Sequence, residues 1–378
     1  MKMVKVALAG AGGYGEYFYL QHLLEDTFHL PVSLVGIVEP YPERTPSCAV
    51  CRERGIPIYP DVESFYREHT ADLMIVSSPI PYHASQSVYA VSHGSHVLCE
   101  KPTAALPSDA QKMLLAEKNT GKSIFIGFQL SFTEPILSLK RDILSGRFGR
   151  ALSGKCMVLW ERDFAYYTRG SGWAGKLKTA KGEAIRDSIA SNAAAHYLHN
   201  LLFLLGSDLS SASQAEVMDA ELCRANDIET FDTCVLRLRE QNGAKLLFIA
   251  SHATKGWLDP VFQLRFEHGT VYCTENGEPR LWAVMDDGSV IEYGNPKTEK
   301  QTAQKLIRTV QWIAGEGEKP VCTVSTTLPF QHVIDSLFTN EEFVPFHESE
   351  IIRDEERGRV YVSGLYERLT QLYESEDL

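Results

Sequence analysis

The sequence predicts two domains of different fold class. The first is an α/β domain with a parallel sheet, and the second is an α+β domain with a large, mainly antiparallel open sheet. A chain of 378 residues is too long for one average domain. The first third alternates short apolar runs with helical patterns, whereas alternating strands follow one another later. We expect domains at residues 1–128 and 129–345, followed by a C-terminal extension with a helix at 346–378.

The N-terminal domain reads as a series of β-α-β units. Its strands are expected at residues 5–9, 33–38, 73–77, 96–99 and 123–128. Amphipathic helices are expected at 85–93 and 108–119. The second of these has Pro107 and Ser108 at its start and Gly121 just past its end, which are typical helix boundaries.

The C-terminal domain carries a different pattern, in which strands succeed one another. We expect strands at 154–159, 233–238, 245–251 and 261–266, and helices at 135–145 and 190–205. Successive strands of this kind predict an antiparallel sheet with helices on one face. The tail, 357–378, reads as a charged amphipathic helix with an acidic tip.

Composition excludes several classes of protein. A net charge of −12 without a long basic run argues against a nucleic-acid or membrane-docking face. Eight dispersed cysteines, with Cys48 and Cys51 as the only CxxC, predict neither disulfides nor a zinc site. We expect a cytoplasmic protein without a catalytic metal.

A glycine-rich turn follows the first strand. Gly10, Gly12 and Gly15 match GxGxxG, with Gly13 and Tyr14 between them, and the pattern opens a helix. Glycines here permit a tight turn and bring backbone N–H groups close to a pyrophosphate at the helix N-terminus. Glu39 ends the second strand, where a carboxylate holds ribose hydroxyls and repels a 2′-phosphate. We therefore expect a Rossmann domain that binds NAD. NADP is the less favoured cofactor, and the nearby Arg44 leaves it as an alternative.

Four further motifs carry a resemblance to a known family. They are Ser78-Pro-Ile-Pro-Tyr-His83, the strand end Glu100-Lys101-Pro102, the segment 126–132, and the helix from His196 to Gly206. Their order and spacing resemble the Gfo/Idh/MocA family, whose name refers to glucose-fructose oxidoreductase and inositol dehydrogenase.

The resemblance implies roles for particular residues. Lys101 would contact the nicotinamide ribose and the substrate oxygen, and His196 would be the catalytic histidine. The cofactor site would also include Ser78, Pro79, His83 and Glu100. A homodimer or homotetramer, paired through the outer face of the second sheet, is implied as well.

The residues themselves support part of this chemistry. Asn192, His196 and His199 are spaced i, i+4 and i+7, which places them on one helix face. Histidine can exchange a proton near neutral pH, and Asn192 can hydrogen-bond a hydroxyl or orient the imidazole. The family usually carries Asp at position 192. Asp187 is out of phase with His196 and is a poor substitute.

Aromatic and polar residues together, in Trp160–Tyr167 and at Trp173, suit the faces and hydroxyls of a sugar. We therefore expect an NAD-dependent dehydrogenase that acts on a secondary alcohol of a sugar, inositol or related polyol. Lys101 and His196 would assist proton transfer, and Trp173, Asn192 and His199 would bind substrate. Two alternatives stay open. One is an enzyme whose tightly bound NAD oxidises a sugar transiently for elimination or epimerisation, and the other is a non-catalytic dinucleotide-binding sensor.

Overall fold

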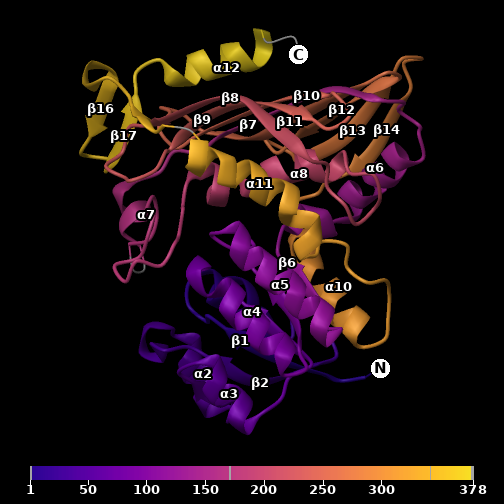
Figure 1. Ribbon diagram of the computed structural model, residues 1–378, viewed down its shortest axis with the longest axis vertical. Coiled ribbons are helices and arrows are strands. Elements are labelled where there is room, and N and C mark those ends of the chain that lie inside the picture. The colour runs from indigo at the N-terminus through magenta and orange to yellow at the C-terminus, as the bar shows by residue number, and fades with distance from the viewer. Residues whose placement is uncertain (1, 170–171, 341, 376–378) are drawn as a thin grey trace. The chain divides into compact units, whose positions relative to one another are not determined.

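The computed structural model describes residues 2–169, 172–340 and 342–375 (Figure 1). The chain forms two compact units. Unit 1 comprises Met1–Phe132 and Ala303–Leu328, and unit 2 comprises Thr133–Thr302 and Pro329–Leu378. Unit 1 is thus discontinuous in sequence, unlike the contiguous domains expected from the sequence.

Unit 1 contains a six-stranded parallel sheet in the order β3-β2-β1-β4-β5-β6. Its strands are β1 (Val4–Ala9), β2 (Val32–Val38), β3 (Ile58–Tyr59), β4 (Leu73–Val76), β5 (His96–Cys99) and β6 (Ile124–Ile126). All four residues of β4 are buried, as expected for a strand covered on both faces. The predicted parallel α/β domain is confirmed, and β3 is a short addition to it.

Helices connect these strands. They are a π-helix, η1 (Gly15–Leu20), with α1 (Gln21–Glu25), α2 (Ser47–Glu53), α3 (Val62–Glu68), α4 (His83–Ser92) and α5 (Pro107–Thr120). Short 3-10 turns lie at η2 (Pro42–Arg44), η3 (Ile80–Tyr82) and η4 (Gln129–Phe132). Helix α5 begins at Pro107 and ends before Gly121, which has a φ of 69°. This end needs the left-handed conformation that glycine adopts without strain.

Residues 303–328 belong to unit 1 and follow, in the sequence, all but the last strand of the second sheet. Helix α10 (Gln304–Ile313) carries Trp312, whose ring lies 4.8 Å from that of His96 and 5.4 Å from that of Phe125. The backbone N–H of Ile126 donates to the carbonyl of Cys322 at 2.9 Å. The returning segment, called the return segment below, therefore extends the edge of the sheet at β6. Local sequence patterns carry no information about such a long-range contact.

Unit 2 contains a nine-stranded sheet in the order β14-β13-β12-β11-β7-β10-β9-β8-β15. Its strands are β7 (Ala151–Leu159), β8 (Ala215–Arg224), β9 (Thr233–Glu240), β10 (Lys245–Ser251), β11 (Leu258–Phe266), β12 (Gly269–Thr274), β13 (Arg280–Met285), β14 (Val290–Gly294) and β15 (Val344–Pro345). Two pairs, β10 with β7 and β15 with β8, are parallel, and the others are antiparallel. The expected large, mainly antiparallel sheet is confirmed.

The helices of unit 2 differ from expectation in one place. They are α6 (Glu134–Leu144), α7 (Phe164–Thr168), η5 (Ile189–Ala193), α8 (Ala195–Leu204), α9 (Glu299–Thr302), α11 (Val324–Asn340, which begins in unit 1) and α12 (Leu365–Ser375). The single helix expected at 190–205 is interrupted at Ala194 (φ −95°, ψ 7°), where the π-helix η5 ends and α8 begins. Asn192 and His196 therefore do not belong to one regular helix, and their i, i+4 spacing does not by itself place them on one face.

The C-terminal tail was predicted as helix from residue 357, which is wrong for its first part. Strand β17 (Arg359–Val362) pairs with β16 (Ile351–Asp354) in a two-stranded hairpin after the 3-10 turn η6 (Glu348–Glu350). Arg-Val-Tyr-Val alternates with the period of a strand, and this alternation prevails over the helical signal that follows it.

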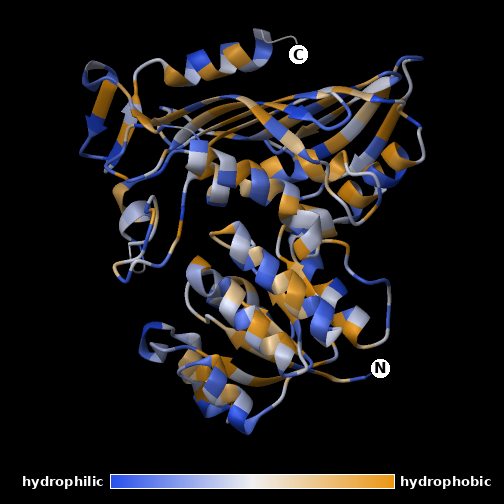
Figure 2. Ribbon diagram, in the orientation of Figure 1, coloured by the Kyte–Doolittle hydropathy of each residue, from blue (hydrophilic) through white to orange (hydrophobic). Residues whose placement is uncertain are grey.

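Helix α12 covers the outer face of the sheet. Figure 2 shows hydrophobic residues interspersed with hydrophilic ones along α12, and Figure 1 places it on the side of the sheet away from α8. Leu365 and Leu369 pack with Val360, Met157 and Ile249 in one apolar cluster. Helices therefore lie on both faces of this sheet, and the expectation that they lie on one face was wrong. No helix in the described ranges is long and apolar enough to cross a membrane.

Candidate functional site

The glycine turn after β1 is shaped by close backbone contacts. Gly10 has a φ of +82°, and a Cβ atom there would lie 2.4 Å from the backbone nitrogen of Ser78. A Cβ atom on Gly15 would lie 1.9 Å from the carbonyl oxygen of Gly10. Gly13, at φ +55°, has no other atom within 4 Å of its Cβ position, so the turn is open on that side. This cradle of backbone, with open space beside it, fits the pyrophosphate of a dinucleotide.

The turn leads directly into helical structure, as expected. The first helical segment is the π-helix η1, and α1 continues it to Glu25. Gly12 lies between the turn and the helix, and its carbonyl accepts from the N–H of Gly15 at 3.1 Å. The helix N-terminus is a favourable place for a bound anion.

Glu39 lies beside the turn, at the end of β2. Its carboxylate accepts from the N–H groups of Ala11 and Tyr41, each at 3.1 Å. These two bonds fix the carboxylate next to the glycine cradle, as required for contact with ribose hydroxyls. Arg44 is directed over the ring of Tyr41, with its guanidinium carbon 4.8 Å from the ring centre.

Replacing Glu39 by Ser is expected to lower the preference for NAD over NADP by about tenfold or more, because like-charge repulsion of a 2′-phosphate is removed. Dissociation constants for both dinucleotides, measured by fluorescence titration, check this. Glu63→Ser, an exposed acid on α3, makes the same change in net charge and serves as control. An unchanged preference in Glu39→Ser would show that Glu39 does not face the ribose.

The segment after β4 lies beside the glycine turn, because the backbone of Ser78 approaches Gly10. Ser78 donates through Oγ to the side chain of Gln86 at 2.7 Å, and Pro79 is exposed. His83 is buried, with its ring nitrogens 2.8 Å from the carbonyl oxygen of Pro102 and 2.9 Å from that of Ser78. Burial lowers the pKa of His83. The imidazole thus bridges the two loops that follow β4 and β5, and the structure places it as a support for both.

Glu100 and Lys101 end β5 at the same edge of the sheet as the glycine turn. Lys101 is half-buried, and Glu100 is buried. One oxygen of Glu100 accepts from the hydroxyl of Tyr19 at 2.6 Å. Gly127, the residue after β6, approaches so closely that a Cβ atom there would lie 3.0 Å from this carboxylate.

The partner of Glu100 was not found from the sequence. Lys305, on the return segment, is fully buried and forms an ion pair with Glu100. Its Nζ also donates to the hydroxyl of Tyr14 at 3.0 Å and lies 4.5 Å from the ring centre of Phe18. A lysine about two hundred residues from the signature gives no local signal of this contact. We call these residues the Lys305 network: Tyr14, Phe18, Tyr19, Glu100 and Lys305.

The charges of the Lys305 network are mutually stabilising. Burial alone would raise the pKa of Glu100, but the adjacent Lys305 cation holds that pKa below its usual value. Burial would lower the pKa of Lys305, but Glu100 raises it above its usual value. Both groups are therefore charged at neutral pH. The network joins the first helix of the glycine turn to the residue that precedes Lys101.

In unit 2, the structure joins Asn192 to Asp187. The amide Nδ2 of Asn192 donates to the carboxylate of Asp187 at 2.8 Å, and the same carboxylate accepts from the N–H of Gly175 at 2.7 Å. Both side chains are buried. The expectation that Asp187 is a poor substitute considered only its phase relative to His196. Asp187 nevertheless contacts the side chain at position 192 directly, through this hydrogen bond.

The two histidines of α8 have different surroundings. His196 is half-buried. His199 is fully buried against Phe203 and Phe330, with ring centres 5.9 and 6.3 Å away. Burial, with a smaller contribution from Lys140, lowers the pKa of His199 to about 3. The structure therefore places His199 in the packed interior of unit 2.

Trp173 lies in the loop before η5, with the guanidinium carbon of Arg169 5.1 Å from its ring centre. The described residues contain no group of three His, Cys, Asp or Glu side chains that could hold a metal ion. Cys48 and Cys51 are both buried free thiols on α2.

A parallel sheet, a glycine turn opening a helix and an acidic residue at the end of the second strand define a dinucleotide-binding Rossmann domain. Residues 4–128 match the model of the GFO_IDH_MocA family, described as an oxidoreductase family with an NAD-binding Rossmann fold. Residues 4–128 therefore have the nucleotide-binding fold of this family, and the resemblance read from the sequence is confirmed for this part of the chain.

Curated relatives match parts of the chain. A 1-carboxy-3-chloro-3,4-dihydroxycyclo hexa-1,5-diene dehydrogenase of Comamonas testosteroni is 31% identical over 37% of this chain and 33% of its own length. An inositol 2-dehydrogenase of Acidothermus cellulolyticus is 29% identical over 40% of this chain and 43% of its own length. The chain thus spans less than half the length of these two relatives.

The fold as a whole resembles solved structures. The WlbA dehydrogenase of Bordetella pertussis, in complex with NADH and UDP-GlcNAcA, superposes with a TM-score of 0.69. The superposition covers 89% of this chain and 96% of that chain, at 21% sequence identity. This likeness extends the agreement in fold beyond the nucleotide-binding domain.

Proposed function

We propose that the protein is an NAD-dependent oxidoreductase that acts on a secondary alcohol of a sugar, inositol or related polyol. The observation that carries the proposal is the position of Lys101, at the edge of the parallel sheet onto which the glycine turn also opens. Ligands of open α/β sheets bind at this edge. The inositol dehydrogenases among the relatives support the substrate class.

In this proposal the chain's own residues position the alcohol and move its proton. Lys101 supplies a positive charge that stabilises the substrate oxygen as its proton leaves. His196 accepts that proton in oxidation and returns it in reduction. Asn192, oriented by Asp187, hydrogen-bonds a hydroxyl. Bound NAD would accept the carbinol hydrogen together with its electron pair.

The proposal also covers the cofactor and the cellular compartment. Glu39, fixed beside the glycine turn, favours NAD over NADP. Eight free cysteines suit a reducing cytoplasm.

We propose a homodimer or homotetramer that pairs through the part of the outer sheet face beyond α12, where Tyr272 stacks on Trp282 with 5.4 Å between the ring centres. A monomeric mass by light scattering would overturn this assembly.

NADH is expected to form when NAD and sugars, inositols or sugar acids are added to the purified protein, because His196 can accept the hydroxyl proton. Absorbance in the reduced-nicotinamide band measures it. His196→Ala should reduce the rate by about 10²- to 10⁴-fold. His347→Ala, at an exposed position beside η6, should leave the rate unchanged. Equal rates for wild type and His196→Ala would remove His196 from the mechanism.

The replacement of the family Asp by Asn192 favours a second candidate, an enzyme whose NAD stays bound during elimination or epimerisation. Copurified NAD with substrate conversion but no NADH release would identify it. Cofactor binding without conversion of any sugar would instead favour a sensor.

A further inference from the structure

Arg162 is a cation without a carboxylate partner in the part of unit 2 that the structure describes. It follows β7, and its guanidinium carbon lies over three aromatic rings, 4.7 Å from the centre of Tyr166, 5.6 Å from Trp160 and 5.7 Å from Trp257. Its Nε is buried and has no hydrogen-bond acceptor. The residue as a whole is half-buried, and buried hydrogen-bond donors normally have an acceptor.

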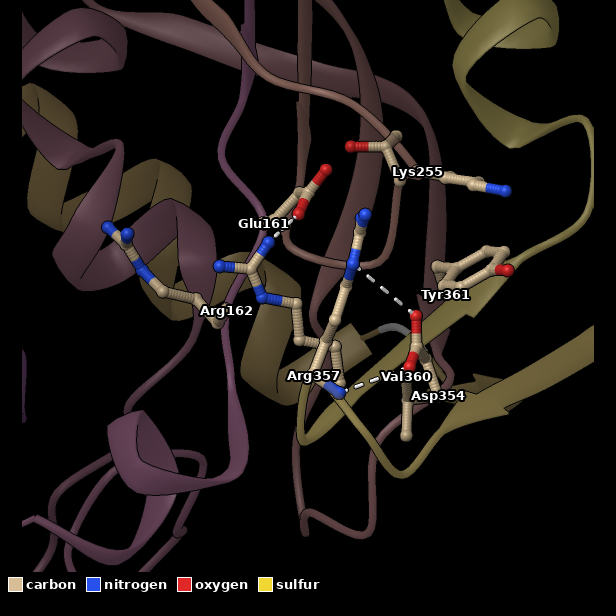
Figure 3. Close-up of a pocket in the computed structure, with 9 residues that line it drawn as sticks. Glu161, Arg162, Lys255, Asp354, Arg357, Val360 and Tyr361 are labelled. Atoms are coloured by element: carbon tan, nitrogen blue, oxygen red, sulfur yellow. Dashed lines mark hydrogen bonds and ion pairs between the residues drawn. The ribbon is translucent and has the colours of Figure 1, made fainter.

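The neighbouring Arg357, unlike Arg162, has a carboxylate partner. Figure 3 shows a pocket whose lining includes Glu161, Arg162, Asp354 and Arg357. Arg357 pairs with Asp354 at 3.8 Å. The side chain of Arg162 is directed away from both Glu161 and Asp354 (Figure 3). Arg162 is therefore oriented towards the aromatic residues and away from the acids of this pocket.

Two more polar groups beside Arg162 have no partner. His252 is 3% exposed, and its ring centre lies 5.4 Å from that of Tyr166. Its Nδ1 is 2.8 Å from the carbonyl oxygen of Trp160, whereas its Nε2 is buried and unbonded. The buried hydroxyl of Tyr167 is also unbonded.

The chemistry of this group of residues is specific. Burial, followed by the charge of Arg162, lowers the pKa of His252 to about 3, so the ring is neutral. Since Nδ1 faces a carbonyl, it carries the proton, and Nε2 is an acceptor. We call Trp160, Arg162, Tyr166, Tyr167, His252 and Trp257 the arginine cluster. It offers a cation, a hydrogen-bond acceptor, a hydroxyl and aromatic faces.

The arginine cluster adjoins the residues proposed for catalysis in unit 2. Burial raises the pKa of Tyr166, and the nearby carboxylate of Asp187 raises it further. Asp187 in turn holds the amide of Asn192 at 2.8 Å. A second guanidinium, that of Arg169, lies 3.7 Å from the ring centre of Tyr166. Tyr166 thus links two arginines to the Asp187–Asn192 pair.

We propose that the arginine cluster binds a carboxylate, and that the substrate is a sugar acid or polyol acid whose carboxylate is held by Arg162. This inference rests on the proposed function and narrows its substrate. A planar carboxylate matches the fork of a guanidinium. His252 Nε2 accepts from a substrate hydroxyl, and the aromatic rings contact the sugar face.

The test compares matched substrates on the full-length protein with NAD. D-glucuronate and D-gluconate are paired with D-glucose and myo-inositol, and kcat/KM is measured from NADH formation. Arg162→Gln is expected to lose roughly 10- to 100-fold in kcat/KM for the acids, the usual worth of a charged hydrogen bond. Neutral substrates should change by less than about threefold. The kcat/KM of Arg162→Lys for the acids should fall between those of wild type and Arg162→Gln, because lysine keeps the positive charge but lacks the forked pair of N–H donors.

Arg357→Gln is the matched control, since that residue lines the same pocket but pairs with Asp354; it should leave acid selectivity unchanged. A parallel loss for acids and neutral sugars in Arg162→Gln would overturn the inference and indicate a packing role. A preference for a sugar phosphate over the acids would also overturn it.

Thermal shift separates this inference from the proposed function. Stabilisation of wild type, but not of Arg162→Gln, by D-glucuronate without NADH formation would support the carboxylate site while the dehydrogenase function fails. NADH formation from neutral polyols alone, unaffected by Arg162→Gln, would support the function and overturn the carboxylate site.

Discussion

Lys101→Met is expected to reduce kcat by about 10²- to 10⁴-fold, the range for removal of a positioned proton-transfer or charge-stabilising group. Methionine keeps most of the apolar stem and removes the ammonium, so packing at the end of β5 changes little. The NAD dissociation constant should change far less than kcat, because the glycine turn and Glu39 are untouched. Steady-state rates and fluorescence titration measure the two quantities separately.

Lys118→Met, at an exposed position on α5 of the same unit, provides the control and should retain full activity. An unchanged kcat in Lys101→Met would show that the centre of the chemistry lies elsewhere, even if NAD binding is normal. A large loss of NAD affinity with normal kcat at saturation would make Lys101 a binding residue only.

Lys305→Met is expected to lower the free energy of unfolding of unit 1 by about 3–5 kcal/mol, because it leaves the buried carboxylate of Glu100 without its counter-ion. Denaturant unfolding measures this. The double variant Lys305→Met with Glu100→Gln removes both charges and should recover part of the loss. Lys319→Met changes an exposed lysine on the same return segment and should stay within about 0.5 kcal/mol of wild type.

The pH dependence of this effect has a definite sign. In the wild type, the lowered pKa of Glu100 stabilises the fold at pH values above about 4.3, the pKa of an unfolded glutamate. This stabilisation is lost as the pH falls through the folded pKa. The raised pKa of Lys305 stabilises the fold at pH values below about 10.4, the pKa of an unfolded lysine. This stabilisation is lost as the pH rises through the folded pKa. In Lys305→Met, burial alone raises the pKa of Glu100. The difference between variant and wild type should therefore shrink as pH falls towards 4, and a pH-independent difference would contradict the ion-pair account.

Much of unit 1 was predictable because its signals are local. The glycine turn requires backbone approaches that only glycine allows at Gly10 and Gly15, and the apolar runs of the parallel strands are buried on both faces. The Glu100-Lys101 pair was placed at a strand end by the same kind of pattern. What the pattern could not give was Lys305, whose contact with Glu100 joins segments about two hundred residues apart.

In unit 2 the local signals were weaker. A continuous apolar helix was expected around His196, but the π-helical turn that begins after the Ser188 cap ends at Ala194. The helical phase of Asp187 was compared only with His196, so the contact between Asp187 and Asn192 was not predicted. The burial of His199 was also hidden, since an apolar helix has no polar face from which exposure can be read.

The return segment has a consequence for how the protein is made. When the first 132 residues have left the ribosome, β6 still lacks the backbone of Cys322, and Phe125 lacks the ring of Trp312. An open strand edge with an uncovered aromatic side chain is prone to pair with other chains. The nucleotide-binding unit can close only after residues 133–302 of unit 2 have been synthesised. An expression fragment ending near residue 132 should therefore aggregate, whereas a fragment that joins residues 303–328 to it through a flexible linker should be the smallest one that folds.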